Sequence, residues 1–165
     1  MQRVLMVDVD GVLITGRPED GKSWATDLEA DLGVPLGPLQ DRFFAPHWDE
    51  IVTGVKPLRP TLDEALAEIN SGLSVTTFLD YWFTRDARRD EGLISALQRA
   101  RADGLRVLLA TNQEPTRARY LWDTLACPRS PRRCSAPLIW AWRNRHRGSL
   151  PPPWPTPVPR QRHIF

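Results

Sequence analysis

The sequence predicts an α/β fold in which a parallel sheet is interrupted by a helical insert. Two short apolar runs carry this prediction, RVLMVD at residues 3–8 and LRVLLATN at residues 105–112, and each ends in polar residues. A helical pattern directly precedes the second run, so the chain crosses between the strands through a helix and the strands lie parallel. From Ser23 to about Phe83 the pattern is also helical, broken by turn signals.

The individual elements follow from local patterns. Residues 3–8 predict a buried strand, because the run is almost wholly apolar, and residues 9–21, with three glycines and one proline, predict a loop. We expect helices over residues 23–33, 60–72, 74–86, 90–104 and 114–125. The second of these begins at Pro60-Thr61, and Glu64 completes a capping box with Thr61. The aromatic residues of the third helix, Phe78, Tyr81, Trp82 and Phe83, are interpreted as core.

The chain divides into three parts of different composition. Residues 1–15 and 88–125 form the predicted α/β core, residues 16–87 the helical insert, and residues 126–165 a tail. All 20 acidic residues lie at or before Asp123, whereas the tail contains eight arginines and nine of the 16 prolines, with no Asp, Glu or Lys. Such a composition predicts either a disordered segment or a product of an altered reading frame.

Several classes of protein are excluded by simple patterns. The chain has no run of about eighteen apolar residues, which excludes a transmembrane helix. Asp8 and Asp10 interrupt the apolar N-terminal run, which argues against a secretory signal and favours a cytoplasmic location. The two cysteines lie in the tail and support neither a disulfide framework nor a zinc site. The sequence indicates no oligomeric state.

Two carboxylates follow the first strand. Asp8 and Asp10 are separated by one residue, so their side chains start on the same side of the chain. A divalent cation such as Mg²⁺ would neutralise them, and one carboxylate could then attack phosphorus while the other handles a proton. An Asp-Gly turn, in which Asp side chains accept backbone N–H groups, is an equally good interpretation of DVDG alone.

Polar residues also follow the second strand. Thr111 offers a hydroxyl and Asn112 a backbone N–H group just before the helix of residues 114–125, an arrangement that suits an anion. An ordinary helix N-cap is the alternative interpretation of ATNQEP. Ligands of open parallel sheets bind beyond the carboxyl ends of the strands, which places Asp8, Asp10, Thr111 and Asn112 at one predicted site.

Together these segments resemble the haloacid dehalogenase (HAD) superfamily. VLMVDVDGVL, residues 4–13, is similar to its first motif, and VLLATNQ, residues 107–113, is similar to its second. The helical sequence between them looks like the subgroup with a helical cap inserted after the first motif. The resemblance covers residues 3 to about 125. It implies a Rossmann-like core with a cap, and Mg²⁺-dependent hydrolysis of the phosphate ester of a small phosphorylated metabolite through an aspartyl-phosphate.

The resemblance also implies roles for the four residues. Asp8 would be the nucleophile and Asp10 the general acid and base, with the Asp8 carboxylate and the Asp10 carbonyl binding Mg²⁺. Thr111 would bind a phosphoryl oxygen with help from the backbone of Asn112. A carboxylate at position 10 favours a phosphatase, because the dehalogenases of this superfamily lack it.

Two further motifs of the superfamily are missing. Beyond Leu125 there is no lysine to steady the phosphoryl charge and no acidic pair to complete the Mg²⁺ site, so the C-terminal part of the core is expected to be absent. The codons of WAWRNRHR, residues 140–147, read in a shifted frame allow G-V-A-K-P, which resembles the missing lysine motif. We therefore favour a frameshift after about residue 125 and doubt the activity of this chain. The alternative is a catalytically inactive protein whose basic tail binds nucleic acid or acidic partners; nucleic acid is not the partner we favour.

Overall fold

A small parallel sheet forms one end of the molecule. The computed structural model describes residues 3–70, 72–125 and 139–140. Its strands are β1 (Val4–Val7), β2 (Arg106–Leu109) and β3 (Ile139–Trp140), in the order β1-β2-β3. β1 pairs with β2 from Val4↔Arg106 to Val7↔Leu109, and β2 pairs with β3; both pairings are parallel. This confirms the predicted α/β class with a parallel sheet.

Strand β1 is more exposed than its apolar sequence suggested. Val4, Leu5 and Met6 are 49%, 38% and 58% exposed, and only Val7 is buried. Among the described residues β1 pairs with β2 alone and therefore lies at the edge of the sheet. The prediction of a buried strand is wrong for this reason, since an apolar run is buried on both faces only where neighbouring elements cover it.

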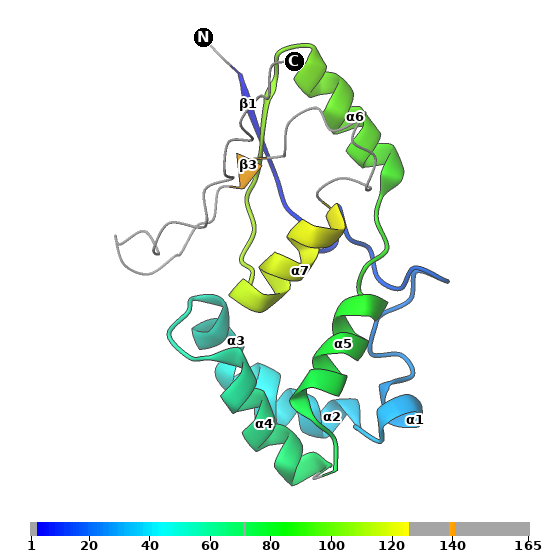
Figure 1. Ribbon diagram of the computed structural model, residues 1–165, viewed down its shortest axis with the longest axis vertical. Coiled ribbons are helices and arrows are strands. Elements are labelled where there is room, and N and C mark those ends of the chain that lie inside the picture. The colour runs from blue at the N-terminus through cyan, green and yellow to red at the C-terminus, as the bar shows by residue number, and fades with distance from the viewer. Residues whose placement is uncertain (1–2, 71, 126–138, 141–165) are drawn as a thin grey trace, which may run out of the picture.

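Two helices accompany the sheet. Helix α6 (Glu91–Ala102) directly precedes β2 in the chain, and helix α7 (Pro115–Leu125) follows β2. Asp90 caps α6, because its carboxylate accepts the N–H of Leu93 at 2.8 Å. Figure 1 shows α6 beside the strands and α7 between the sheet and the remaining helices.

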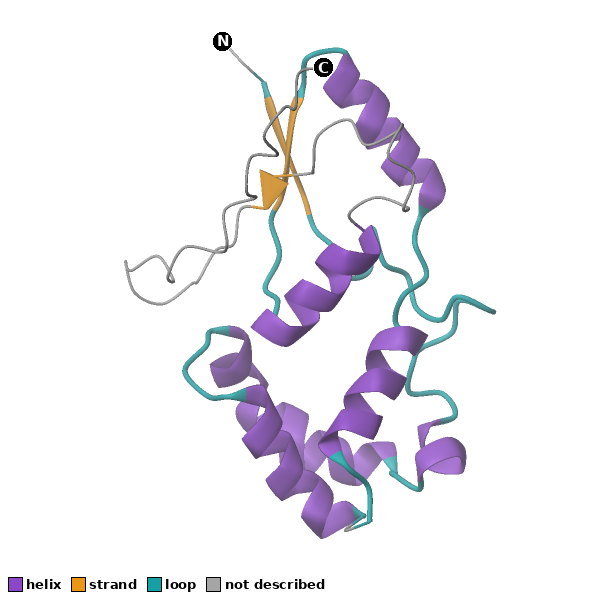
Figure 2. Ribbon diagram, in the orientation of Figure 1, coloured by secondary structure: helices purple, strands orange, loops and turns teal. Residues whose placement is uncertain are grey.

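The remaining helices form a separate helical unit, which Figure 2 shows at the opposite end from the strands. Its elements are α1 (Leu28–Leu32), α2 (Leu36–Leu39), the π-helix η1 (Gln40–Phe44), α3 (Ala45–Val52), α4 (Leu58–Ile69) and α5 (Val75–Arg85). Helix α4 begins two residues before the predicted Pro60. The predicted capping box is wrong, because Thr61 lies inside the helix, whose N-cap is Pro57; the Thr61 hydroxyl instead donates to the carbonyl of Pro57 at 2.8 Å.

Each unit has its own hydrophobic core. The core of the helical unit contains Phe43, Phe78, Trp82 and Phe83, which confirms the predicted core role of three of the four aromatic residues of α5; the fourth, Tyr81, is only partly buried. The core of the sheet unit joins strand residues to α6 and α7 through side chains such as Val107, Ile94 and Leu121. Tyr120 on α7 packs against both cores, and its ring lies 5.4 Å from that of Phe83. Helix α7 therefore connects the two units.

Two chain segments also connect the units and are hydrogen-bonded to each other. The N–H of Thr15 donates to the carbonyl of Arg88, and the N–H of Arg88 donates to the carbonyl of Gly16, both at 2.9 Å. Gly16 has a φ of +94°, and a Cβ there would lie 2.5 Å from the carbonyl oxygen of Lys22. Because this turn requires both a positive φ and close backbone approach, glycine is the residue that fits.

Most of the tail lies outside the described residues. The expectations for residues 126–138 and 141–165, namely disorder, a shifted reading frame or nucleic-acid binding, lie outside the described residues. The two described tail residues form β3, an element that the sequence analysis did not predict.

Candidate functional site

The candidate site begins where two paired strands end. Val7 and Leu109 are register partners, and the N–H of Ala110 donates to the carbonyl of Val7 at 2.8 Å. Asp8 therefore leaves β1 at the same level of the sheet at which the segment leading to Thr111 leaves β2. This is the carboxyl edge of the sheet, where ligands of open parallel sheets bind.

Asp8 is exposed at this edge. Its Oδ1 accepts the N–H of the next residue, Val9, at 2.7 Å. This is the local turn interaction that the sequence left open as an alternative to a catalytic role. The two interpretations are compatible, because one backbone hydrogen bond fixes the orientation of an exposed carboxylate that remains accessible from solvent.

Asp10 is held by two side chains from the other strand end. Gln113 Nε2 donates to Asp10 Oδ2, and Arg117 Nη2 lies 3.7 Å from Asp10 Oδ1. Gln113 is only 3% exposed, and its Nε2 also donates to Thr111 Oγ1 at 3.4 Å. Gln113 thus connects Asp10 to Thr111, although about one hundred residues separate them along the chain.

Thr111 and Asn112 differ in environment. Thr111 is buried, whereas Asn112 is exposed. The predicted anion site at the start of α7 is altered by Glu114, whose carboxylate accepts the N–H of Thr116 at 2.7 Å and that of Arg117 at 3.0 Å. The first backbone donors of α7 are therefore occupied by the protein's own carboxylate, and Glu114 is the N-cap that the alternative interpretation of ATNQEP anticipated.

Arg117 is, like Gln113, a site residue that the sequence analysis missed. It is 3% exposed, and Nη2 lies 2.9 Å from Asp86 Oδ2. Burial raises the pKa of Asp86 and lowers that of Arg117, while the attraction between the two opposes both shifts. The guanidinium stays protonated at neutral pH. The sequence contained one signal. Arg117 lies in the first turn of the predicted helix, where the helix dipole disfavours a cation unless a negative group lies nearby.

The donor set suits a weakly coordinated magnesium ion. Mg²⁺ prefers hard oxygen ligands, keeps several waters and uses one or two carboxylates, which the exposed Asp8 carboxylate and the Asp10 carbonyl can satisfy. Within residues 3–70, 72–125 and 139–140, no group of three or more His, Cys, Asp or Glu side chains is arranged to hold a metal. Of the oxygen ligands that the resemblance implies, the described residues supply the exposed Asp8 carboxylate and the Asp10 carbonyl, without a cluster of further carboxylates.

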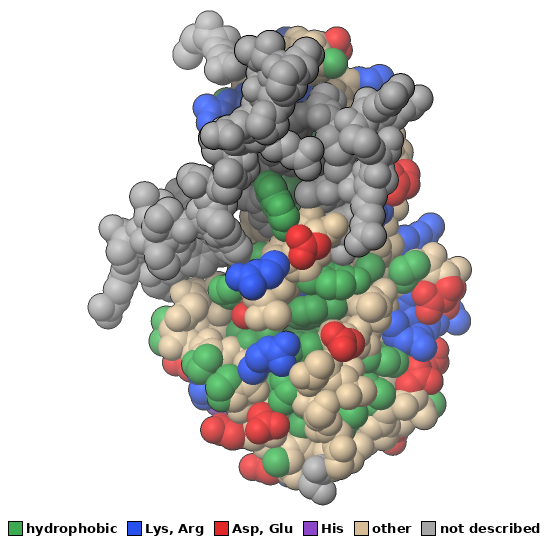
Figure 3. Space-filling model, viewed as in Figure 1, with side chains coloured by type: hydrophobic (Ala, Val, Ile, Leu, Met, Phe, Trp, Pro, Cys, Tyr) green, Lys and Arg blue, Asp and Glu red, His purple; other side chains and the backbone are tan. Residues whose placement is uncertain are grey.

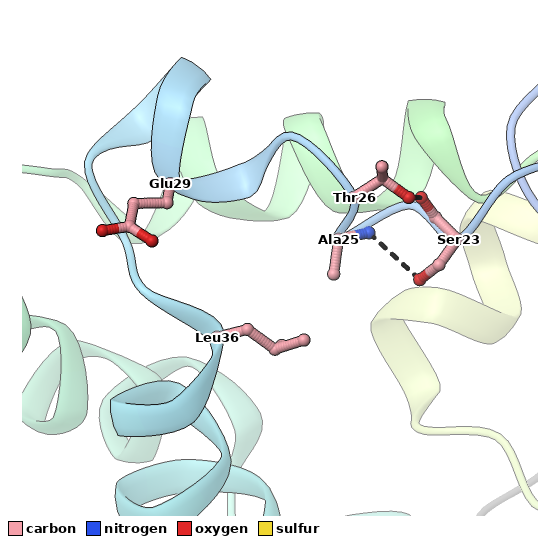
Figure 4. A pocket seen from close by; sticks show the side chains of 5 residues that line it. All are labelled: Ser23, Ala25, Thr26, Glu29 and Leu36. Atoms are coloured by element: carbon pink, nitrogen blue, oxygen red, sulfur yellow. Dashed lines mark hydrogen bonds between the residues drawn. The ribbon is translucent and has the colours of Figure 1, made fainter.

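A surface pocket of about 330 Å³ lies elsewhere, in the helical unit. Figure 4 shows its lining residues, Ser23, Ala25, Thr26, Glu29 and Leu36, with the N–H of Ala25 donating to Ser23 Oγ at 3.3 Å. None of the four predicted site residues lines it. Since it presents a carboxylate and no basic side chain, it does not suit a phosphate group.

Helices long and apolar enough for a membrane crossing do not occur in the part of the chain that the structure describes. In comparisons with known proteins, no family model and no curated protein matches the chain. A solved structure does match: a HAD family enzyme from Bacteroides thetaiotaomicron, crystallised with magnesium and inorganic phosphate. It is 13% identical, with a TM-score of 0.49, and the match covers 74% of this chain and 59% of that enzyme.

Proposed function

We propose that this chain carries the chemistry of a Mg²⁺-dependent phosphate-ester hydrolase acting through an aspartyl-phosphate. The observation that carries the proposal is the connection of Asp10 to Thr111 through Gln113 at the carboxyl edge of the sheet. It brings a proton-transferring carboxylate and a hydroxyl donor to the edge from which Asp8 projects. The motifs that resemble the HAD superfamily assign complementary roles to the same residues.

The proposed reaction has two steps. An Asp8 carboxylate oxygen attacks phosphorus, the bond from phosphorus to the ester oxygen breaks, and Asp10 donates its proton to the departing oxygen. In the second step Asp10 accepts a proton from water, the water oxygen attacks phosphorus, and the Asp8–phosphorus bond breaks. Ester and water are consumed, alcohol and inorganic phosphate are released, and both carboxylates return to their starting states.

The surrounding residues bind the phosphoryl group. The Thr111 hydroxyl and the Asn112 backbone would donate hydrogen bonds to its oxygens. Mg²⁺, held by the Asp8 carboxylate and the Asp10 carbonyl, would supply positive charge that offsets the phosphoryl oxygens when bound. The helical unit would act as a cap over this edge and set the choice of a small phosphorylated metabolite as substrate.

Slow turnover is part of the proposal. Among the described residues the cation at the site is Arg117, and it is already paired with Asp86. Glu114 places a further buried carboxylate next to the expected phosphoryl position at the start of α7. Because phosphoryl transfer depends mainly on positioning and on stabilising negative charge, this balance of charges disfavours a fast reaction.

The test is detection of the aspartyl-phosphate. The protein is mixed with an aryl phosphate and millimolar Mg²⁺, quenched in acid, and weighed intact by mass spectrometry. We expect a fraction of the chain to gain one phosphoryl group, and Asp8→Asn to abolish both this species and phenol release, because an amide is not a nucleophile. Asp63→Asn, an exposed position on α4, is the matched control. Phosphorylation that persists in Asp8→Asn would remove Asp8 from its role.

A further inference from the structure

We propose that Arg117 is a positioning residue for Asp10, and that it fixes Asp10 relative to the end of helix α5 in the helical unit. The inference rests on the proposed function, since it concerns the proton-transferring group of that reaction. It adds a residue that none of the sequence motifs contains, on helix α7, where the two units meet.

The Asp10 carboxylate is held at both of its oxygens. Gln113 donates to Oδ2, and the Arg117 guanidinium faces Oδ1 at 3.7 Å. The Asp10 side chain is 52% exposed and sits on the loop that follows β1, so it would otherwise sample several rotamers in water. A hydrogen bond at one oxygen and an ion-pair contact at the other restrict the carboxylate more than either contact alone.

The other side of Arg117 is anchored to the end of α5. Its Nη2 donates to the carbonyl of Asp86 at 2.6 Å and to the Asp86 carboxylate at 2.9 Å, and its Nη1 donates to the carbonyl of Phe83 at 3.3 Å. The guanidinium also lies 5.2 Å from the centre of the Phe83 ring. Carbonyls at the C-terminal end of a helix carry partial negative charge and suit a cation. Arg117 is therefore fixed by groups of the helical unit, and its charge lies 3.7 Å from Asp10 Oδ1 as an ion-pair contact.

This location is costly for an arginine. The side chain is only 4% exposed and belongs to the first turn of α7, where the helix dipole disfavours a cation. A purely structural link between α7 and α5 would be complete with Asp86 and the two carbonyls. The additional approach to Asp10 is what joins this buried cation to the proposed reaction.

The role has a specific kinetic consequence. A displaced Asp10 can no longer give its proton to the departing oxygen in the correct geometry, and a misplacement of about 1 Å costs about a hundredfold in rate. An ester whose alcohol is weakly acidic needs that proton, whereas one with a strongly acidic phenol leaves without it. Loss of Arg117 should therefore slow the first step for the former ester and spare it for the latter.

The experiment compares phenyl phosphate with 2,4-dinitrophenyl phosphate in wild type, Arg117→Met, Arg117→Lys and the control Arg119→Met, an exposed arginine of the same helix. Rapid acid quench follows formation of the phosphorylated chain. For Arg117→Met we expect the first step with phenyl phosphate to slow about a hundredfold, with little change for the dinitrophenyl ester. KM should change little, because Arg117 does not contact the substrate. Arg117→Lys should recover part of the loss, and Arg119→Met should match wild type.

The outcomes distinguish the positioning role of Arg117 from the proposed hydrolase function. Equal slowing of both esters would show a merely structural role and overturn the inference, as would unchanged rates for both. If the wild-type chain forms no phosphorylated species with either ester, the proposed function falls, and the role of Arg117 falls with it. Should Arg117→Met fail to give a native tryptophan emission spectrum, Arg117→Lys provides the same comparison. A single ammonium cannot reach Asp10, Asp86 and two carbonyls together, so it too should slow phenyl phosphate selectively.

Discussion

Replacing Asp86 with Asn should destabilise the protein, because it leaves the buried Arg117 without its nearest counter-charge. The Nη2–Oδ2 distance is 2.9 Å, and the Asp86 side chain is 21% exposed. A pair of unit charges about 4 Å apart contributes about 4 kcal/mol at the effective dielectric constant typical of partly buried sites. The burial cost of the Asp86 carboxylate, which raises its pKa, opposes this attraction.

The expected loss is therefore about 2–3 kcal/mol of unfolding free energy, somewhat below the 3–5 kcal/mol typical of a buried charge left wholly uncompensated. Asp10 accounts for the difference. It remains 3.7 Å from Arg117, but its side chain is half exposed, so its attraction is worth only about 1 kcal/mol. With a urea dependence of about 2 kcal/mol per molar, the unfolding midpoint should fall by about 1 M.

Urea unfolding followed by tryptophan emission measures this change, since Trp82 lies in the core of the helical unit close to the end of α5. Asp63→Asn on the exposed face of α4 is the control and should leave the midpoint unchanged. The double variant Asp86→Asn/Arg117→Met should lose less than the sum of the two single variants, because it removes both charges of the pair. A loss below about 1 kcal/mol in Asp86→Asn, or strict additivity in the double variant, would refute the assigned pairing.

Two further predictions concern acid stability and the tail. Hydrogen bonds from Arg17 hold the pKa values of Asp20 and Asp27 below their ordinary range, so their contribution to stability is complete above the unfolded pKa of about 3.9 and is lost as the pH falls through the lower folded values. The thermal midpoint of wild type should thus drop steeply below about pH 4 and that of Arg17→Met should drop less; parallel curves would contradict this. Restoring the shifted reading frame after residue 125 should raise hydrolysis of an aryl phosphate at least about a hundredfold, because it would supply a lysine and a late carboxylate. Equal activity of both chains, or a nucleotide sequence around codon 126 with no such downstream frame, would contradict the frameshift.

The fold was predictable where one pattern dominated a segment. The strand pair, α5, α6 and α7 follow from periodicity with clear start and stop residues, such as Asp90 before α6 and Pro115 at the start of α7. No individual helix was assigned between Leu36 and Val52, although the general helical pattern from Ser23 to about Phe83 includes this stretch, which is helical throughout as α2, η1 and α3. Its prolines and glycine suggested breaks.

The π-helical turn explains why that stretch can remain helical. In a regular α-helix the ring of Pro46 would clash with the carbonyl of Arg42, four residues earlier. The wider turn of η1, residues 40–44, directly precedes Pro46 and gives the ring room. Phe43 within this turn is buried in the core of the helical unit, a tertiary contact that local propensity does not contain.

The exposure of β1 could not be predicted from its local sequence pattern either. An apolar run indicates that a strand can be covered, but coverage depends on which elements the rest of the chain supplies. The described residues place β2 on one side of β1 and α6 and α7 in the adjoining core, and Val4, Leu5 and Met6 remain exposed.

The green area in Figure 3, between α7 and the helices α4 and α5, shows that hydrophobic side chains also reach the surface where the two units meet.

The candidate site shows the same division between local and distant information. Asp8, Asp10 and Thr111 could be proposed from the sequence because each directly follows an apolar run. Arg117 could not, because its role depends on contacts with residues 10 and 86, which come from a different strand end and a different unit.

The sequence analysis searched for a positive charge beyond Leu125, where the superfamily resemblance places a lysine. Within the described residues the structure instead offers a cation before that point, on α7, already balanced by Asp86. A balanced cation cannot offset the charge of a phosphoryl group as an unpaired lysine would, but it can hold a carboxylate in place without attracting phosphate. A lysine of the kind that the resemblance implies would neutralise charge, whereas Arg117 can only fix geometry.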